Sequence, residues 1–221
     1  AWVKCTIGEL AEIVRGSSPR PIQNPKWFDV NSEIGWLKIS NVTEQNGRIF
    51  NLEQRISTLA QEKTRVLFTP HLLLSIAATV GKPVINYVKT GVHDGFLIFL
   101  NPKFEQEFMF QWLEAFRSQW QRYGQPGSQV NLNSDLVRSQ EIYVPSIQEQ
   151  YKIGKFLHSI DDLITVNERE LNKLKDLKKS YLEKMFPKNG SDIPELRFPG
   201  YADAWVKCTI GELAEIVRGS S

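Results

Sequence analysis

Several polar segments of this 221-residue sequence combine glycine with side chains that can hydrogen-bond to phosphates or to base edges. Arginine and lysine can contact guanine or phosphate, whereas asparagine and glutamine can form paired hydrogen bonds to adenine. The candidate DNA contacts are Arg15, Ser17, Ser18, Arg20, Lys38, Asn41, Thr79, Lys82, Lys89, Gln129, Asn131 and Asn133. These residue types are also ordinary turn formers, so each segment taken alone leaves both interpretations open.

The residues that could support catalysis do not form a recognisable motif. The sequence contains three histidines, His71, His93 and His158. None of them has cysteine or carboxylate residues at the spacing of a zinc site. Gly81 and Lys82 resemble part of a phosphate-binding loop, but Ile76 and Pro83 occupy the positions that need glycine and Ser or Thr. A Ser, His and Asp arrangement assembled in space stays open. We expect a protein that is not an enzyme, with no metal site and no cofactor of its own.

Composition and charge limit the class of protein. Hydrophobic residues make up 41% and charged residues 24% of the chain, which excludes disorder and leaves ample material for a core. No apolar run approaches the roughly 20 residues that cross a bilayer, and no signal peptide is evident, so the sequence predicts a cytoplasmic protein without membrane contacts. The formal net charge is only +2, so attraction to DNA must come from a local basic patch.

The sequence repeats its own beginning. Residues 1–18 recur letter for letter as residues 204–221, so Cys5 and Cys208 are equivalent positions. The period is too long for a solenoid, whose units run roughly 20 to 50 residues. The pattern indicates one full unit followed by the start of a second. The two cysteines are expected to be free thiols, with a disulfide between the copies as the alternative.

The first 145 residues predict a mixed α+β domain. Thr6 and Glu9 have the spacing of a capping box, which predicts a short helix that continues to Val14 and stops at Gly16. Apolar segments bounded by turn residues predict strands at 35–40, 72–78, 83–88, 95–100 and 141–144.

An aromatic stripe predicts a helix over residues 103–123. Its ring side chains recur at helical spacing, and they are Phe104, Phe108, Trp112 and Phe116. We expect this stripe to face the core. A platform on which bases stack is the alternative.

Residues 146–186 predict one long helix that begins at a second capping box and carries a coiled-coil seam. Its alternating steps of four and three residues give the seam Ile160, Ile164, Asn167, Leu171, Leu174, Lys178, Tyr181 and Met185. Because such a helix would be about 60 Å long, its apolar edge needs a partner helix. Asn167 and Lys178 would specify register or partner choice. A helix folded back across its own domain is the alternative. Residues 187–203 form a linker to the second copy of the repeat.

In their order along the chain, these segments resemble the specificity subunit of type I restriction-modification systems. The matching motifs are WLKISNV at 36–42, QVNLN at 129–133, IYVP at 142–145, DDLI at 161–164 and PELRFPGY at 194–201. The resemblance implies a target-recognition domain at 1–145, a spacer helix at 146–186 and the start of a second recognition domain at 204–221.

The resemblance also implies function and partners. The protein would be a non-catalytic subunit that recognises half of a bipartite site in double-stranded DNA and positions methyltransferase and restriction subunits. S-adenosylmethionine, ATP and magnesium would bind those partner subunits. One spacer helix per chain predicts a homodimer through an antiparallel coiled coil. A coiled-coil interaction protein without specific DNA recognition is the alternative.

Overall fold

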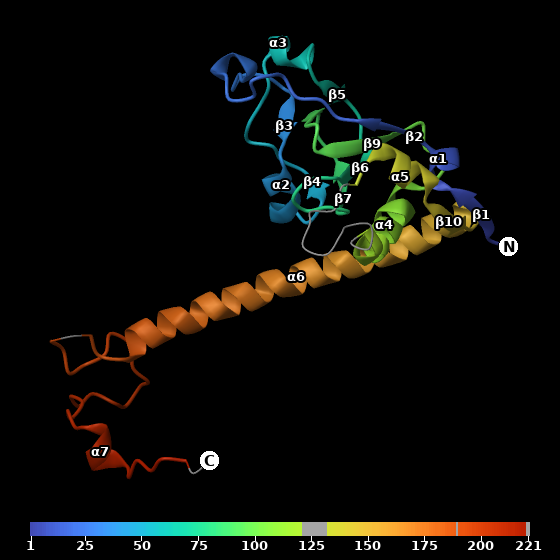
Figure 1. Cartoon of the computed structure of the whole chain (residues 1–221). Helices are drawn as coiled ribbons and strands as arrows, with labels where there is room; N and C mark the ends of the chain where they lie inside the picture. The colour runs from blue at the N-terminus through green and yellow to red at the C-terminus, as the bar shows by residue number, and fades with distance from the viewer. Residues whose placement is uncertain (121–131, 189, 220–221) are drawn as a thin grey trace. The chain divides into compact units, whose positions relative to one another are not determined.

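The computed structural model describes residues 1–120, 132–188 and 190–219 (Figure 1). The chain forms two compact units, Ala1–Ser159 and Ile160–Ser221. Within the described residues, the first unit contains sheets of five, three and two strands. Among these same residues, no helix is long and apolar enough to cross a membrane.

The five-stranded sheet forms the middle of the first unit. Its strands, in spatial order, are β2 (Glu12–Arg15), β9 (Phe96–Leu100), β6 (Leu72–Ser75), β7 (Pro83–Asn86) and β4 (Arg48–Ile49). Neighbouring strands pair antiparallel except β4 and β7, which are parallel. β6, β7 and β9 are almost wholly buried, since apolar packing covers both faces of the sheet.

Two smaller sheets extend this architecture. β8 (Thr90–Val92) lies between β3 (Gly35–Leu37) and β5 (Arg65–Leu67), and pairs parallel with the former and antiparallel with the latter. β1 (Val3–Thr6) and β10 (Glu141–Val144) form the antiparallel two-stranded sheet. The start of the first unit is therefore held against its last strand.

Among the described residues, the helices that precede α6 in the first unit are mostly short. They are α1 (Ile7–Leu10), η1 (Pro25–Trp27, a 3-10 helix), α2 (Ile39–Glu44), α3 (Thr58–Gln61), α4 (Gln106–Trp120) and α5 (Ser134–Ser139). The expected aromatic stripe faces the core: Phe104 and Phe108 are buried, and Trp112 and Phe116 are half-buried against the same apolar cluster. The prediction that this stripe packs inward is confirmed.

Two local predictions were wrong. The helix expected to reach Val14 ends at Leu10, because the next residues pair with β9 and become strand β2. Gly16 therefore follows a strand instead of ending a helix. The strand expected to reach residue 40 ends at Leu37, because the Asn41 side chain accepts from the backbone N–H of Lys38 at 3.0 Å and caps α2.

The long helix is present as α6 (Ile147–Met185). Its first turns belong to the first unit, where the Gln150 side chain accepts from the backbone N–H of Glu105 and donates to the carbonyl of Pro145, both at 2.9 Å. Gly154 permits close packing, since a Cβ there would lie 2.7 Å from the backbone nitrogen of Phe108. These contacts fix the start of α6 against α4.

The second unit contains the remainder of α6, a linker and the second copy of the repeat. The side chains of the seam predicted for α6 are exposed except Met185, which is half-buried; Ile164, Leu171 and Leu174 are each about half accessible. Beyond the helix, Trp205 packs edge-on against Phe186 with ring centres 5.9 Å apart. The helix α7 (Ile210–Leu213) repeats α1 in sequence and in length.

Candidate nucleic-acid interface

Gly16 brings the segment after β2 directly against the end of β8. The backbone N–H of Gly16 donates to the Phe96 carbonyl at 2.9 Å, and that of Ser17 donates to the Val92 carbonyl at 3.0 Å. A Cβ on Gly16 would lie only 2.2 Å from the His93 carbonyl oxygen. Glycine is therefore required here by close approach of two backbones.

Asp94 gathers the polar side chains of this segment. Its carboxylate accepts from the Ser18 hydroxyl at 2.9 Å and from Nη2 of Arg20 at 2.8 Å. Its backbone carbonyl accepts from Nε of Arg15 at 2.6 Å. Arg15 at the end of β2 and Arg20 in the segment after it thus converge on one aspartate.

A third arginine joins from β5. Nε of Arg65 donates to the Arg15 carbonyl at 2.9 Å, and the neighbouring Thr64 hydroxyl donates to the carbonyl of Ser17. Arg15, Arg20 and Arg65 are all exposed, and we call these three residues with Asp94 the arginine cluster. Each arginine is anchored through part of its guanidinium, so further N–H groups can reach a ligand.

The electrostatics of the arginine cluster favour an anion. Burial raises the pKa of the Asp94 carboxyl, but the Ser18 hydrogen bond and the charges of His93, Arg20 and Arg15 outweigh burial and bring this pKa below its ordinary value. Asp94 is therefore ionised at neutral pH. With three guanidinium groups and one carboxylate, the arginine cluster carries a net positive charge. It is a local basic patch of the kind that DNA binding needs at a net charge of only +2.

His93 stands beside the arginine cluster in its neutral form. Burial lowers its pKa despite the opposing charge of Asp94, and the charges of Arg20 and Arg15 lower it further. Its Nδ1 lies 2.9 Å from the backbone N–H of Gly95, and this contact requires Nδ1 to be an acceptor. The ring meets Trp36 edge-on at 5.7 Å.

Two hollows meet at His93. One, of about 420 Å³, is lined by Ser18, Pro19, Arg20, Pro21, Ile22, Gln23, His93 and Asp94. The other, of about 230 Å³, is lined by Ile22, Phe28, Trp36, Lys38, Ile39, Gln54 and His93. Lys38, another predicted contact, therefore adjoins the same surface.

Gly95 lies in close contact with two further segments beside the arginine cluster. A Cβ there would lie 3.4 Å from Cβ of Ala77 and 3.5 Å from Cδ1 of Ile39. The turn after β6 and the start of α2 thus converge beside the arginine cluster. Thr79 belongs to that turn, where its hydroxyl bonds to Ser75 at 3.2 Å.

Other predicted contacts have structural partners elsewhere. Lys82 lies 3.0 Å from Oδ1 of Asn46 and 3.1 Å from a Glu114 oxygen, and its side chain is only 14% exposed. Lys89 pairs with Glu33. Both lysines therefore have acceptors within the protein, away from the arginine cluster, and their role as DNA contacts stays a prediction.

Two of the predicted amide contacts, Asn41 and Asn133, use their side-chain oxygens within the protein. Oδ1 of Asn133 accepts from the backbone N–H groups of Asp135 and Leu136 at 3.1 and 2.9 Å, so it caps α5. Asn41 uses its amide oxygen to cap α2. Gln129 and Asn131 lie outside the described residues.

Sequence reasoning missed Arg65, His93 and Asp94. Arg65 reaches the arginine cluster only because β5 pairs with β8, where Arg65 is opposite Val92. None of the three belongs to a motif with fixed spacing. The segment at 93–95 could have been found only through its contact with Gly16.

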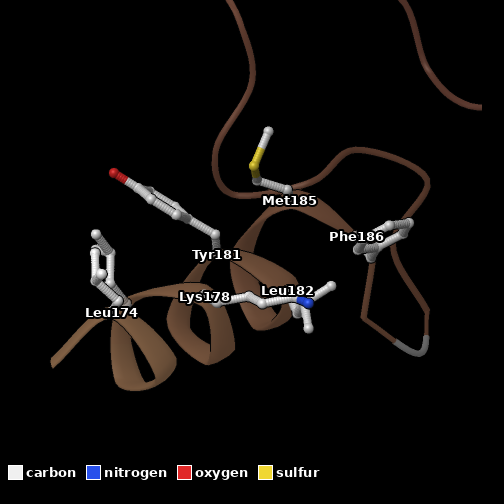
Figure 2. Close-up of a pocket in the computed structure, with 7 residues that line it drawn as sticks. Leu174, Lys178, Tyr181, Leu182, Met185 and Phe186 are labelled. Carbon is white, nitrogen blue, oxygen red and sulfur yellow. The ribbon is translucent and has the colours of Figure 1, made fainter. Parts of the chain in front are cut away.

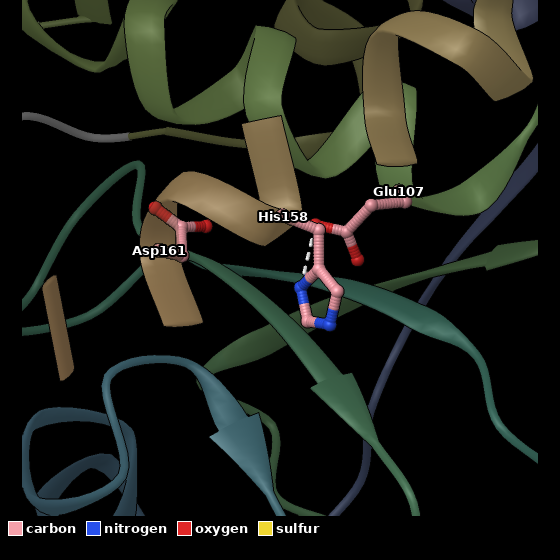
Figure 3. Close-up of side chains that lie close together, drawn as sticks. All are labelled: Glu107, His158 and Asp161. Carbon is pink, nitrogen blue, oxygen red and sulfur yellow. Dashed lines mark ion pairs between the residues drawn. The ribbon is translucent and has the colours of Figure 1, made fainter. Parts of the chain in front are cut away.

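A second charged group joins α4 to the start of α6. Nδ1 of His158 lies 3.7 Å from Oε1 of Glu107 (Figure 3). Both oxygens of Glu107 also accept from Arg48, at 2.5 and 2.7 Å, and the pair is largely buried. The Arg48 charge compensates the Glu107 carboxylate. We interpret this buried pair as a structural contact that holds β4 against α4.

The chain belongs to the type I restriction modification DNA specificity domain family, whose model matches residues 1–176. This finding confirms the resemblance recognised in the sequence, and the observed architecture confirms an α+β domain followed by a long helix.

Solved structures share the fold. The HsdS subunit from Thermoanaerobacter tengcongensis is 19% identical with a TM-score of 0.58, and the match covers 84% of this chain and 44% of that one. A chain from a structure that describes complex assembly and conformational transition of the type I R-M system is 17% identical with a TM-score of 0.65, and the match covers 83% of this chain and 45% of that one. The S subunit from M. genitalium is 14% identical with a TM-score of 0.54, over 84% and 46%. This chain spans less than half the length of each.

Proposed function

We propose that this chain is a non-catalytic DNA specificity subunit that reads one half of a bipartite site through the arginine cluster. The observation that carries the proposal is that Arg15 and Arg20 converge on Asp94, while Arg65 is anchored on the Arg15 carbonyl. An arginine whose orientation is fixed can present paired donors to guanine or to phosphate. Family membership supports the same function.

The proposal includes a homodimer formed by antiparallel pairing of α6. All the predicted seam side chains except Met185 are exposed. Leu174, Lys178, Tyr181, Leu182, Met185 and Phe186 line an apolar hollow of about 280 Å³ near the helix end (Figure 2). A second copy of the helix would bury this edge. The 39 residues of α6 rise about 58 Å, so the helix pair would act as a spacer. A two-fold dimer would then read a palindromic site with an unspecified gap.

The proposed partners are a methyltransferase subunit and a restriction subunit, which would bring S-adenosylmethionine, ATP and magnesium to a cytoplasmic complex. No step of that chemistry is assigned to this chain. Its role is to bind DNA and to hold those subunits at the site.

Co-purification with a methyltransferase subunit, followed by sequencing of methylated DNA, tests the proposal. We expect methylation at one gapped palindrome. Arg15→Ala should abolish it, whereas Arg218→Ala, the same change in the second copy of the repeat, should not. Methylation without sequence preference, or equal effects of the two variants, would contradict it.

A coiled-coil interaction protein is the second candidate, and the exposed seam of α6 is the observation that favours it. Such a protein would bind DNA weakly and with little dependence on salt, because no phosphates would be neutralised. Binding measured between 50 and 200 mM salt separates the two candidates, because a protein that makes roughly 6 to 10 phosphate contacts loses about 10³-fold or more of its affinity over this range.

A further inference from the structure

The repeated segments have the same sequence but different surroundings. In the first copy, Ile7 and Ile13 are 0% and 1% exposed. In the second copy, the equivalent Ile210 and Ile216 are 71% and 76% exposed. The second copy therefore carries an apolar face that the first copy buries.

The first copy shows what covers that face. β1 pairs with β10, with Cys5 opposite Ile142, and β2 pairs with β9. Between the strands, the backbone N–H of Ile7 donates to the Gln140 carbonyl at 2.9 Å. We call β9, β10 and α5 the terminal docking site.

α5 completes the terminal docking site. Nη2 of Arg138 donates to the Ile13 carbonyl at 2.5 Å. A Cβ on Gly8 would lie 3.1 Å from the Arg138 carbonyl oxygen, so this glycine permits α1 to pack closely on α5.

The second copy is partly preformed for this site. The Glu212 carboxylate accepts from the backbone N–H and hydroxyl of Thr209 at 2.6 and 2.9 Å. In the first copy, Glu9 makes the same bonds to Thr6 at 2.6 and 2.8 Å. The helical turn thus forms without the docking site, whereas the strands require it.

We propose that residues 204–221 of one chain can occupy the terminal docking site of a second copy of this chain in place of its residues 1–18. An identical sequence would make identical contacts, so the intrinsic affinities of the two segments are equal. Effective concentration then decides which segment binds. In an undisturbed chain the covalently close first copy is favoured, and the second copy binds when the first is released.

The choice of a second chain as host rests on the proposed dimer. In an antiparallel pair, the end of α6 in one copy lies beside the start of α6 in its partner. That start follows β10 by two residues, at 145 and 146. The second repeat would therefore arrive next to the partner's docking site. Reciprocal exchange would give a closed two-fold dimer.

Rescue of folding tests the inference. Ile7→Asp with Ile13→Asp should expel the first copy, because two carboxylates would otherwise be buried without partners. We expect this variant to retain a cooperative thermal transition whose midpoint rises with protein concentration, since docking is intermolecular. Adding Ile210→Asp and Ile216→Asp should remove that transition. The matched control, Ile210→Asp with Ile216→Asp alone, should unfold like the unmodified chain.

Each other outcome overturns a defined part of the inference. If the double and quadruple variants unfold alike, residues 204–221 do not dock. If the double variant folds as a monomer at every concentration in sedimentation, docking occurs within one chain and the second-copy host is wrong. The proposed function is judged separately, by sedimentation and DNA binding of the unmodified chain.

Discussion

Nη2 of Arg20 lies 2.8 Å from Oδ2 of Asp94, and the other carboxylate oxygen accepts from Ser18 at 2.9 Å. The Arg20 side chain is 81% exposed, yet its guanidinium is anchored at one end. A long exposed side chain otherwise samples many rotamers. Asp94 therefore acts as a positioning residue for an arginine that faces solvent.

Replacement of Asp94 should reduce specificity more than affinity. Asp94→Asn removes the charge that orients Arg20, so we expect discrimination at one base position to fall by about 1 to 3 kcal/mol. Binding to unrelated DNA should be unchanged or tighter, because a negative charge is lost from the arginine cluster. Competition binding against single-base variants of the site measures both quantities. Asp135→Asn is the control, because Asp135 is also a carboxylate paired with an arginine, Arg138, but is exposed and lies outside the arginine cluster. Equal weakening on every sequence would contradict a positioning role.

Gly16 and Gly219 provide a matched pair for stability. A Cβ on Gly16 would overlap the His93 carbonyl oxygen at 2.2 Å, whereas nothing lies within 4 Å of one on Gly219. We expect Gly16→Ala to lower the free energy of unfolding by about 1 to 3 kcal/mol. Gly219→Ala should change it by less than about 0.5 kcal/mol. Urea denaturation of both variants measures the difference. Equal stabilities would show that the backbone at residue 16 can move away from His93 without loss of stability.

The repeat also shows how much of this fold is local. The helical turn at residues 7–10 was predicted from its capping pattern and recurs at 210–213 without tertiary support. Residues 12–15 form a strand only where β9 is available, so no local pattern could predict it. The helix α6 was predictable because its apolar periodicity lies within one continuous segment, whereas the pairing of its seam stays a prediction.

The candidate site was only partly predictable, because it too depends on pairing between strands that are distant in the sequence. The segment at 15–20 was identified by its residue types, and its glycine was given the wrong role. Asp94 and Arg65 join it through two separate pairings, β2 with β9 and β5 with β8, which connect residues far apart in the sequence. Lys82 and Asn133 have suitable chemistry, but their partners within the protein could not be identified without the fold.

His93 should make stability depend on pH. Its pKa in the folded chain is below the unfolded value of 6.5, so the unfolded chain binds the proton first as pH falls. The free energy of unfolding should therefore decline as pH drops below about 6.5 and level off below the folded pKa. Asp94, whose pKa is also depressed, adds a separate loss as pH falls below its unfolded value of 3.8.

His93→Asn isolates the first of these effects. The asparagine oxygen can accept from the Gly95 N–H but cannot take up a proton in this range. Denaturation at a series of pH values should give a flatter profile between pH 7 and pH 5 for the variant than for the unmodified chain. Parallel profiles would assign the dependence to another group.

Asn167 should specify register at the expense of dimer stability. Its Nδ2 donates to the Leu163 carbonyl of its own helix at 2.7 Å, and it occupies a seam position. Asn167→Leu should tighten the proposed dimer by about tenfold, or 1.4 kcal/mol, because an apolar seam residue gains burial. Sedimentation equilibrium measures the change. Asn172→Leu, off the seam, should leave the dissociation constant unaltered, and a weaker Asn167→Leu dimer would show that this face does not form the interface.

The two cysteines should differ in reactivity although their sequences match. Cys5 lies in β1, where burial raises the pKa of its thiol and the Glu9 charge raises it further. Cys208 is exposed in the second copy. Because thiolate attacks maleimide, we expect two phases at pH 7, with Cys5 slower by at least about tenfold. Cys208→Ser should remove the fast phase, and Cys5→Ser the slow one. In the variant with Ile7→Asp and Ile13→Asp, docking of residues 204–221 on a second copy should slow the Cys208 reaction as protein concentration rises. A single phase in the unmodified chain would mean that β1 does not protect Cys5.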